Sequence, residues 1–240
     1  AVSSLVTNFQ IALRPQIVKS YASGDCKYML ELIFKGAKYS FFLMYIISFP
    51  IIIEAKSILL LWLKEVPNHT VMFTRLILLN ALIDSLTSTL MMGVQATGKI
   101  KVYQLVISFL MLSSVPVSYL LFSVGYPPEA SYFLIIFVTI IIFVFRILIV
   151  SFLLSFSIKS FIEKVVVRVF GVISLSILAP LLFLYKSRFT GIPQIFSVFV
   201  LTSISILICI YLVGLTKEER IFLKKTIGST TTILYKKLKN

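Results

Sequence analysis

Long apolar runs alternate with short polar connections along the whole chain. About 20 apolar residues are needed to cross the hydrocarbon core of a bilayer, which is ~30 Å thick. Six runs reach this length, and a further apolar segment opens the chain. The predicted membrane segments are 1–22, 37–62, 70–97, 101–123, 129–155, 164–185 and 193–215. Because the connections are short, we predict an all-α polytopic transmembrane bundle of about seven antiparallel membrane helices.

The first segment differs from the others in length. Too few residues precede Arg14 for them to cross a bilayer at a rise of about 1.5 Å per residue. We therefore expect the first helix to be incomplete and the chain to be the C-terminal portion of a longer protein.

Composition places the chain in lipid. Hydrophobic residues make up 59% of the sequence and charged residues only 13%, whereas roughly a quarter of the residues in a typical soluble domain are charged. The net charge is +14, but the basic residues lie between apolar runs and do not form the basic face that nucleic-acid binding requires. We predict the phospholipid bilayer as a partner, and no nucleic acid.

Lysine and arginine residues are divided unevenly between the two sides of the predicted bundle. Of the 23, 17 lie in one alternating set of connections and the C-terminal tail, four lie in the opposite set, and Arg75 and Arg146 lie within spans. Basic residues concentrate on the cytoplasmic side of membrane proteins. We therefore predict that the basic tail, residues 216–240, is cytoplasmic and touches anionic lipid.

Residues suited to catalysis or metal binding are scarce. Cys26 and Cys209 lie far apart and suggest neither a disulfide framework nor a zinc site. His69, the only histidine, falls in an external connection. The sequence contains no glycine-rich phosphate loop and no nucleophile constellation. We expect the protein to be no enzyme and to use no metal and no cofactor.

Polar residues recur at helical spacing in the first segment. A polar stripe facing lipid would be costly, so it should face protein or a watery cavity. Two interpretations stay open, namely hydrogen bonds between helices and the lining of a cavity. The stripe consists of Ser3, Thr7, Gln10 and Arg14, with Asn8 close by.

A second polar stripe follows one face of the segment 70–97 and has an ionisable residue, Asp84, near its middle. Such a residue is expensive inside a membrane and is usually functional. It could be a proton or cation site, the counter-ion of an arginine on another helix, or a neutral acid. Arg75 falls on the opposite face, where it can snorkel to the interface or line a cavity. The stripe consists of Asn80, Asp84, Thr87, Ser88, Met91 and Gln95.

Arg146 is the other charge deep within a predicted span, about two turns from the cytoplasmic end of segment 129–155. Thr139 precedes it by one heptad on the same face. Two roles stay open for Arg146: it binds an anion in the bundle interior, or it binds lipid phosphates at the inner surface.

Four stretches, taken in their order and spacing, point to a family. They are RPQIVKSYASGD, KGAKYSFFLMYIISFPIII, ILLLWLKEVP and ATGKIKVYQ. Together they resemble the C-terminal half of the Wzx-type flippases, bacterial polysaccharide-biosynthesis membrane proteins that are related to the MATE exporters. The likeness covers residues 8–170.

The resemblance implies about fourteen helices in two six-helix lobes plus two extra helices. Residues 1–155 would then form the C-terminal lobe without its first helix, 156–215 the two extra helices, and 216–240 the tail. The missing N-terminal lobe of the same protein would be a partner. Location in a bacterial inner membrane follows from the same resemblance.

The resemblance also implies a function, which is translocation of an undecaprenyl-diphosphate-linked oligosaccharide for O-antigen, lipopolysaccharide, capsule or exopolysaccharide biosynthesis. Glycan polymerase and glycosyltransferases would be functional neighbours. Cationic side chains would neutralise the diphosphate, with Arg14, Arg146 and Arg75 as candidates. Sugar hydroxyls would bind Asn8, Gln10, Asn80 and Gln95. Asp84 would couple transport to a cation gradient.

Three other functions compete with this one. A MATE-like drug or cation antiporter would need an acidic site but little cationic lining. An integral-membrane glycan polymerase or acyltransferase would be expected to carry a histidine or an acid pair in a long external loop, and the external connections here are short. A structural membrane subunit would need no wet polar stripe.

Overall fold

The computed structural model describes residues 2–63, 65–186 and 191–225. These residues form helices and no strand, and six helical segments are long and apolar enough to cross a membrane. The predicted all-α polytopic bundle is confirmed, and the chain is a multi-pass membrane protein. Much of the predicted basic tail, from residue 226 onward, lies outside the described residues, as do residue 64 and residues 187–190.

Several membrane-spanning segments are built from more than one helix. The six segments are Cys26–Ile53, Thr70–Thr97, Ile100–Ser123, Glu129–Leu154, Ile158–Phe183 and Ile192–Gly214. In chain order, the elements are α1 (Val2–Ala22), α2 (Cys26–Ile53), α3 (Ala55–Leu63), α4 (Thr70–Ser85), α5 (Ser88–Thr97), α6 (Ile100–Ser123), α7 (Glu129–Leu154), α8 (Ile158–Phe161), the π-helical turn η1 (Ile162–Val166), α9 (Val167–Ser176), α10 (Leu178–Lys186), α11 (Ile192–Cys209) and the π-helical turn η2 (Ile210–Gly214).

Two predicted segments have wrong boundaries, and the first segment is not one of the six spans. The second span begins at Cys26 instead of residue 37 and ends at Ile53, before the separate helix α3. Its early lysines suggested a connection, but a lysine can bury its stem along a helix when its ammonium finds a partner. Lys38 does so by pairing with Glu219. The span predicted at 164–185 begins at Ile158 instead of residue 164.

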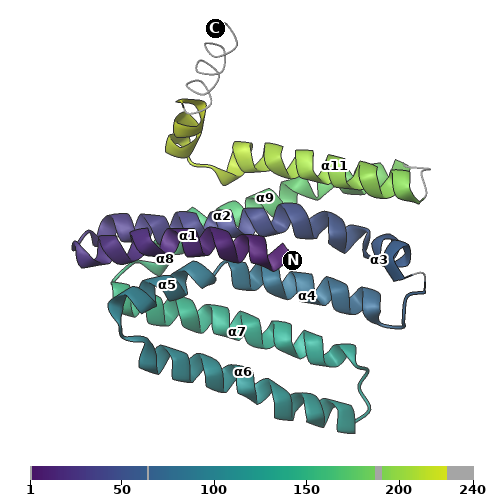
Figure 1. The fold of residues 1–240 in the computed structure, drawn as a ribbon, viewed down its shortest axis with the longest axis horizontal. Helices are drawn as coiled ribbons and strands as arrows, with labels where there is room; N and C mark the ends of the chain where they lie inside the picture. Colours follow the sequence, from purple (N-terminus) through teal and green to yellow (C-terminus); the bar gives the residue numbers. More distant parts are fainter. Residues whose placement is uncertain (1, 64, 187–190, 226–240) are drawn as a thin grey trace, which may run out of the picture.

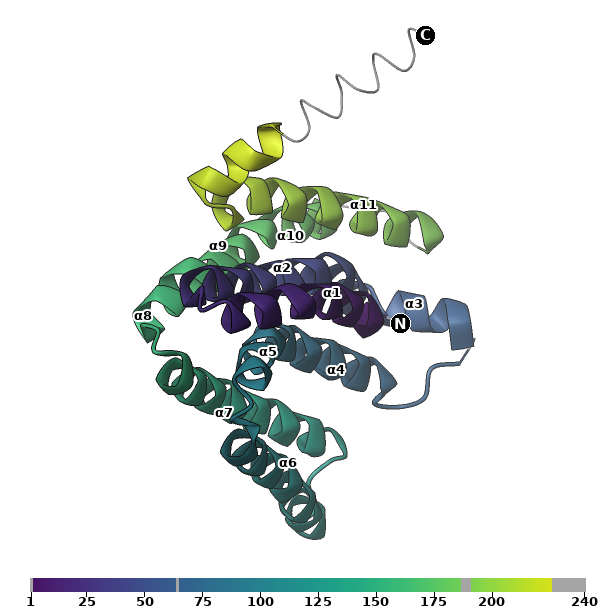
Figure 2. The same ribbon diagram turned by 60° about the vertical axis from the view of Figure 1, so that its left-hand side comes forward.

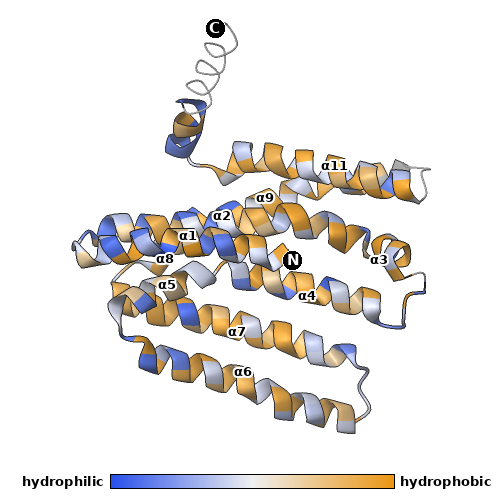
Figure 3. Ribbon diagram, in the orientation of Figure 1, coloured by the Kyte–Doolittle hydropathy of each residue, from blue (hydrophilic) through white to orange (hydrophobic). Residues whose placement is uncertain are grey.

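The helices lie in layers around α2, as Figure 1 shows. One side of α2 carries α9 and α11, the other carries α4 and α5, and α7 and then α6 follow outward. Figure 2 shows that α1 packs along α2 and that α3 projects from the far end of the bundle. Apolar residues dominate the middle of α6, α7 and α11 in Figure 3, and polar residues gather at the helix ends and on α1.

The end of the bundle where α1 turns into α2 also carries the turns between α5 and α6 and between α7 and α8. We call it the lysine-rich end, since it holds Lys27, Lys99 and Lys159. The turn from α1 into α2 contains Gly24 and Asp25. Gly24 has a left-handed φ of +78°, and the Asp25 side chain caps α2 by accepting a 3.0 Å hydrogen bond from the Tyr28 amide.

A proline break in the fifth span is closed by a neighbouring helix. Pro180 cannot donate a backbone hydrogen bond, and the helix is interrupted at Ile177, between α9 and α10. The Ser176 carbonyl accepts a 3.2 Å hydrogen bond from the Ser205 hydroxyl of α11, and the Ser176 hydroxyl lies 3.0 Å from the Tyr45 hydroxyl of α2. These bonds tie the last two spans to α2, because lipid offers no substitute partner.

Close approach of α1, α2 and α5 depends on Gly36. A Cβ atom at this position would lie 2.8 Å from Leu13 Cδ1 and 3.0 Å from Thr89 Cγ2. The Thr89 hydroxyl uses this proximity to donate a 3.1 Å hydrogen bond to the Ile33 carbonyl of α2. Small residues at membrane helix interfaces allow such backbone approach.

We predict that Gly36→Leu lowers the free energy of unfolding by about 1–3 kcal/mol, because the added side chain must push α1 and α5 away from α2. Ala12→Leu on the exposed face of α1 is the control, with an expected change within ~0.5 kcal/mol. Denaturant unfolding in detergent micelles measures both variants. Equal midpoints for the two would show that the packing at Gly36 is loose.

Candidate functional site

The membrane span Thr70–Thr97 is interrupted near its middle. A continuous helix was predicted for 70–97, but α4 ends at Ser85 and α5 begins at Ser88. The Asp84 carbonyl accepts hydrogen bonds from the Thr87 amide (3.0 Å), the Thr87 hydroxyl (3.2 Å) and the Ser88 hydroxyl (2.9 Å). Hydroxyl side chains compete with backbone donors for helix carbonyls, and this competition explains why the break falls here.

Arg146 of α7 binds two side chains at this break. Its Nη1 atom donates to Asp84 Oδ1 over 2.9 Å and to the Thr87 hydroxyl over 2.7 Å. The Arg146 side chain is 10% exposed, whereas the Asp84 side chain is 53% exposed. Of the three interpretations of Asp84, the structure therefore shows the geometry of a counter-ion to an arginine on another helix. The exposed side of the carboxylate must face water or protein, because lipid would exclude it.

A cleft of about 440 Å³ opens beside this charged pair. Met91 of α5, Tyr103 of α6 and Arg146 of α7 are among its lining residues. Tyr103 is almost fully buried, and among the described residues its hydroxyl has no hydrogen-bond partner. The Nε atom of Arg146 likewise has none. The cleft is therefore mostly apolar, and two residues that line it, Tyr103 and Arg146, each carry a buried donor without a partner among the described residues.

The polar stripe on α1 divides between two environments. Gln10 is buried, and its amide lies 3.5 Å from the Ser85 carbonyl, a long and weak hydrogen bond that brings α1 to the break. Thr7, Asn8 and Arg14 are exposed. Of the predicted residues on α1, Gln10 is the one that contacts the break between α4 and α5.

The remaining predicted residues lie farther from the pair. Asn80 precedes Asp84 by one helical turn, and its buried Oδ1 atom has no partner among the described residues. Gln95 is half-buried on α5 and is not among the residues that line the cleft. Arg75 donates to the carbonyls of Ile52 (3.0 Å) and Ile53 (3.5 Å), so it caps the C-terminal end of α2.

Sequence reasoning missed a buried ion pair at the lysine-rich end. Lys38 Nζ lies 2.6 Å from Glu219 Oε2, with side-chain exposures of 3% and 9%. Burial acts to raise the pKa of Glu219, but hydrogen bonds from Lys38 and from the Thr216 amide outweigh it and hold that pKa below its ordinary value. The sequence signal that could have pointed to this pair was Glu219, a carboxylate among many basic residues after the last span.

Tyr103 was also missed. It lies in the first turn of α6, close to the charged connection Gly98–Lys101, where a tyrosine is usually assigned to the membrane interface. Only the packing of α6 against α7 shows that it is buried near Arg146.

The described residues contain no group of three metal-ligating side chains close enough to hold a metal ion. Comparisons of the chain with protein-family models, with curated proteins and with solved structures found no match. The function must therefore be argued from the site itself.

The charged pair can exchange partners. An anion entering the cleft would compete with Asp84 for the Arg146 guanidinium, and a cation or proton would compete with Arg146 for the carboxylate. Because Asp84 is half exposed and Arg146 is buried, the carboxylate is the partner that can leave and find another environment. The site is thus suited to exchanging an internal counter-ion for an external one.

We predict that Asp84→Asn lowers the unfolding free energy by about 1–3 kcal/mol, because it leaves the buried guanidinium without its carboxylate. Arg146→Gln should cost less, about 0–1 kcal/mol, since a half-exposed carboxylate can be hydrated. Denaturant unfolding of both variants and of the double variant gives the coupling energy. A larger loss for Arg146→Gln than for Asp84→Asn would contradict this asymmetry.

Proposed function

We propose that this chain forms one lobe of a membrane transporter that moves a lipid-linked anionic sugar, of the undecaprenyl-diphosphate class, from one leaflet to the other. The six membrane spans are compatible with a transporter in general. The observation that carries the specific proposal is Arg146, a buried guanidinium at a broken helix beside a cleft. The resemblance to the Wzx-type flippases agrees with this choice of substrate.

The position of Arg146 supports an anionic substrate. An arginine costs up to about 2.5–3.5 kcal/mol on translocon-insertion scales, the value at the centre of a span, so an arginine two turns inside the span is kept only where it has a use or a partner. Asp84 supplies a partner, but the Nε donor has none among the described residues, and Arg146 lines the cleft. A diphosphate offers several oxygens to such a guanidinium, which recognises planar and bidentate acceptors.

The exposed polar face of α1 supports a second lobe. Thr7, Asn8 and Arg14 are exposed on α1, and lipid would be an unfavourable environment for them. Facing another lobe across a watery cavity, they would contact the sugar and its diphosphate while the prenyl chain stays in lipid. Rocking of one lobe against the other would then alternate access to the cavity.

The charged pair supplies a way to couple transport to ions. When the diphosphate binds Arg146, Asp84 loses its partner and becomes a site for a proton or a metal cation. Release of the diphosphate on the other side would let Asp84 pair with Arg146 again and expel the ion. Broken helices at the centre of transporters often place substrate and ion sites together in this way.

A cation antiporter is the second candidate, and the half-exposed carboxylate of Asp84 favours it. In that case, a cation would have to displace Arg146, whose charge repels it at 2.9 Å from the carboxylate oxygen. An anion binds at this site more readily than a cation, because the arginine attracts it.

We predict that Arg146→Gln in the full-length protein slows translocation of a fluorescent diphosphate-linked prenyl sugar by tenfold or more, about the effect of one charge-assisted hydrogen bond. Reconstituted vesicles and an impermeant quencher measure the rate. Lys101→Gln, which changes an exposed lysine at the start of α6, should leave it unchanged.

A neutral prenyl glycoside in the same vesicles separates charge recognition from general damage. Its slow background rate should be the same for both variants. Arg146→Gln vesicles that move the diphosphate probe at the wild-type rate would remove Arg146 as its ligand. Sodium- or proton-driven uptake of a cationic dye, lost in Asp84→Asn, would favour the antiporter instead.

A further inference from the structure

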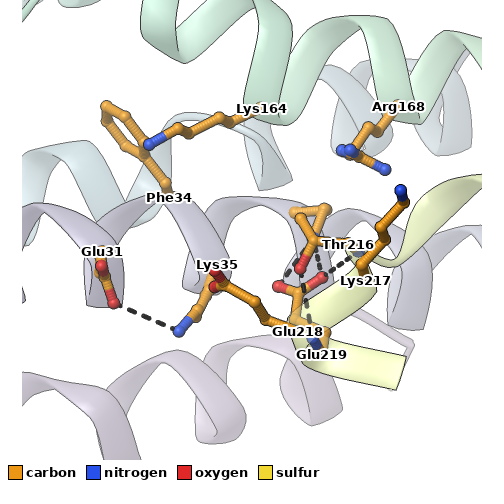
Figure 4. A pocket seen from close by; sticks show the side chains of 10 residues that line it. Glu31, Phe34, Lys35, Lys164, Arg168, Thr216, Lys217, Glu218 and Glu219 are labelled. Atoms are coloured by element: carbon orange, nitrogen blue, oxygen red, sulfur yellow. Dashed lines mark hydrogen bonds and ion pairs between the residues drawn. The ribbon is translucent and has the colours of Figure 1, made fainter. Parts of the chain in front are cut away.

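A second charged cavity lies at the lysine-rich end, away from the Arg146 cleft. It has a volume of about 340 Å³ and opens between α2, the turn η1 with α9, and the segment that follows η2. Figure 4 shows the side chains that line it. Five are cationic and three are carboxylates, so two positive charges stay uncompensated. The lining residues are Glu31, Phe34, Lys35, Lys38, Lys164, Arg168, Thr216, Lys217, Glu218 and Glu219.

Two of the carboxylates are already paired. Glu219 binds Lys38 through two contacts of 2.6 and 2.9 Å, and Glu31 lies 3.4 Å from Lys35 on the same helix. The cations left over are Lys164, Arg168 and Lys217. Among the described residues, none of these three forms an ion pair, and residues 226–240 contain no Asp or Glu.

Arg168 is held in place by the end of η2. Its Nη1 atom donates to the carbonyls of Val213 (3.0 Å) and Leu215 (3.1 Å), and its buried Nε atom has no partner among the described residues. In Figure 4, Arg168 and Lys217 extend toward one another from opposite sides of the cavity. Like charges that face one another repel, so an anion bound between them would stabilise the arrangement.

The backbone around the cavity is irregular. Lys164 lies in the π-helical turn η1, and Arg168 holds the carbonyls at the end of the π-helical turn η2. Single π-helical turns occur frequently at functional sites. The buried Lys38–Glu219 pair fixes the segment after η2 against α2, so Lys217 is presented to the cavity from an anchored backbone.

We propose that this cavity binds a phosphate group, with Arg168 and Lys217 as its main ligands and Lys164 at its rim. A dianionic or monoanionic phosphate satisfies the unpaired cations and accepts several hydrogen bonds from them. Two sources share this chemistry: the headgroup of an anionic phospholipid in the adjacent leaflet, and a soluble phosphate or phosphate ester. The site is independent of the transport proposed for the Arg146 cleft.

Binding of two probes to the whole chain in detergent tests the site. The probes are short-chain phosphatidylglycerol and inorganic phosphate. Their dissociation constants are measured by a thermal-shift assay and by native mass spectrometry. We expect the double variant Lys164→Gln/Lys217→Gln to weaken binding about tenfold or more, the loss of a charge-assisted contact. Lys159→Gln is the matched control, since Lys159 is a highly exposed lysine near the cavity that does not line it.

The outcomes separate the two sources. If phosphate and phosphatidylglycerol compete, and the double variant binds both more weakly, the cavity is a site for the phosphate group from either source. Binding of phosphatidylglycerol alone, again weakened in the double variant, identifies a lipid headgroup site. Equal binding of zwitterionic phosphatidylcholine, or unchanged binding in the double variant, would overturn the proposal. Melting of the unliganded variants checks their folding, and Arg168 is left intact because it also holds η2.

Discussion

A charged pair inside the membrane, Arg146 with Asp84, determines how the interior of this protein is arranged. The break between α4 and α5 frees backbone groups that lipid cannot satisfy, and the Thr87 and Ser88 hydroxyls donate to the Asp84 carbonyl there. The Arg146 guanidinium then binds the side chains of Thr87 and Asp84. The guanidinium in turn needs a carboxylate, because a lone charge at this depth is costly. Helix α7, the broken helix and α1 therefore meet at one place, and the cleft opens beside it.

The charged pair and the cavity at the lysine-rich end both depend on the packing of α2. This helix packs against α1, α4, α5 and α11, and its first half carries Lys35 and Lys38, which line the cavity at the lysine-rich end. The contact at Gly36 holds α1 and α5 close to the same helix. Helix α2 thus lines the cavity at the lysine-rich end directly, and it supports the charged pair through its packing against α4 and α5.

The sequence was sufficient to predict the helical membrane architecture and to identify the two residues of the charged pair, but not the contact between them. Hydropathy predicted the spans because backbone satisfaction in lipid forces apolar runs into helices. Asp84 and Arg146 stood out as charges within those runs, but their pairing could not be predicted, since it depends on the rotation of α7 about its axis. The break at Leu86–Thr87 was hidden, because its residues fit a continuous helical stripe. The burial of Lys38, at the start of the predicted segment 37–62, could not be predicted, since its partner, Glu219, lies 181 residues away along the chain.

Solvent access to the cleft is the most direct measure of whether the charged pair faces water. Cysteine is placed at Met91, a half-buried cleft residue, or at Phe109, a lipid-facing residue of α6 that is 74% exposed, in a background with Cys26 and Cys209 replaced by serine. A water-filled cleft predicts that a membrane-impermeant thiol reagent labels position 91 and spares position 109, although position 109 is the more exposed. Labelling at position 109 with full protection at position 91 would contradict a wet site at Arg146.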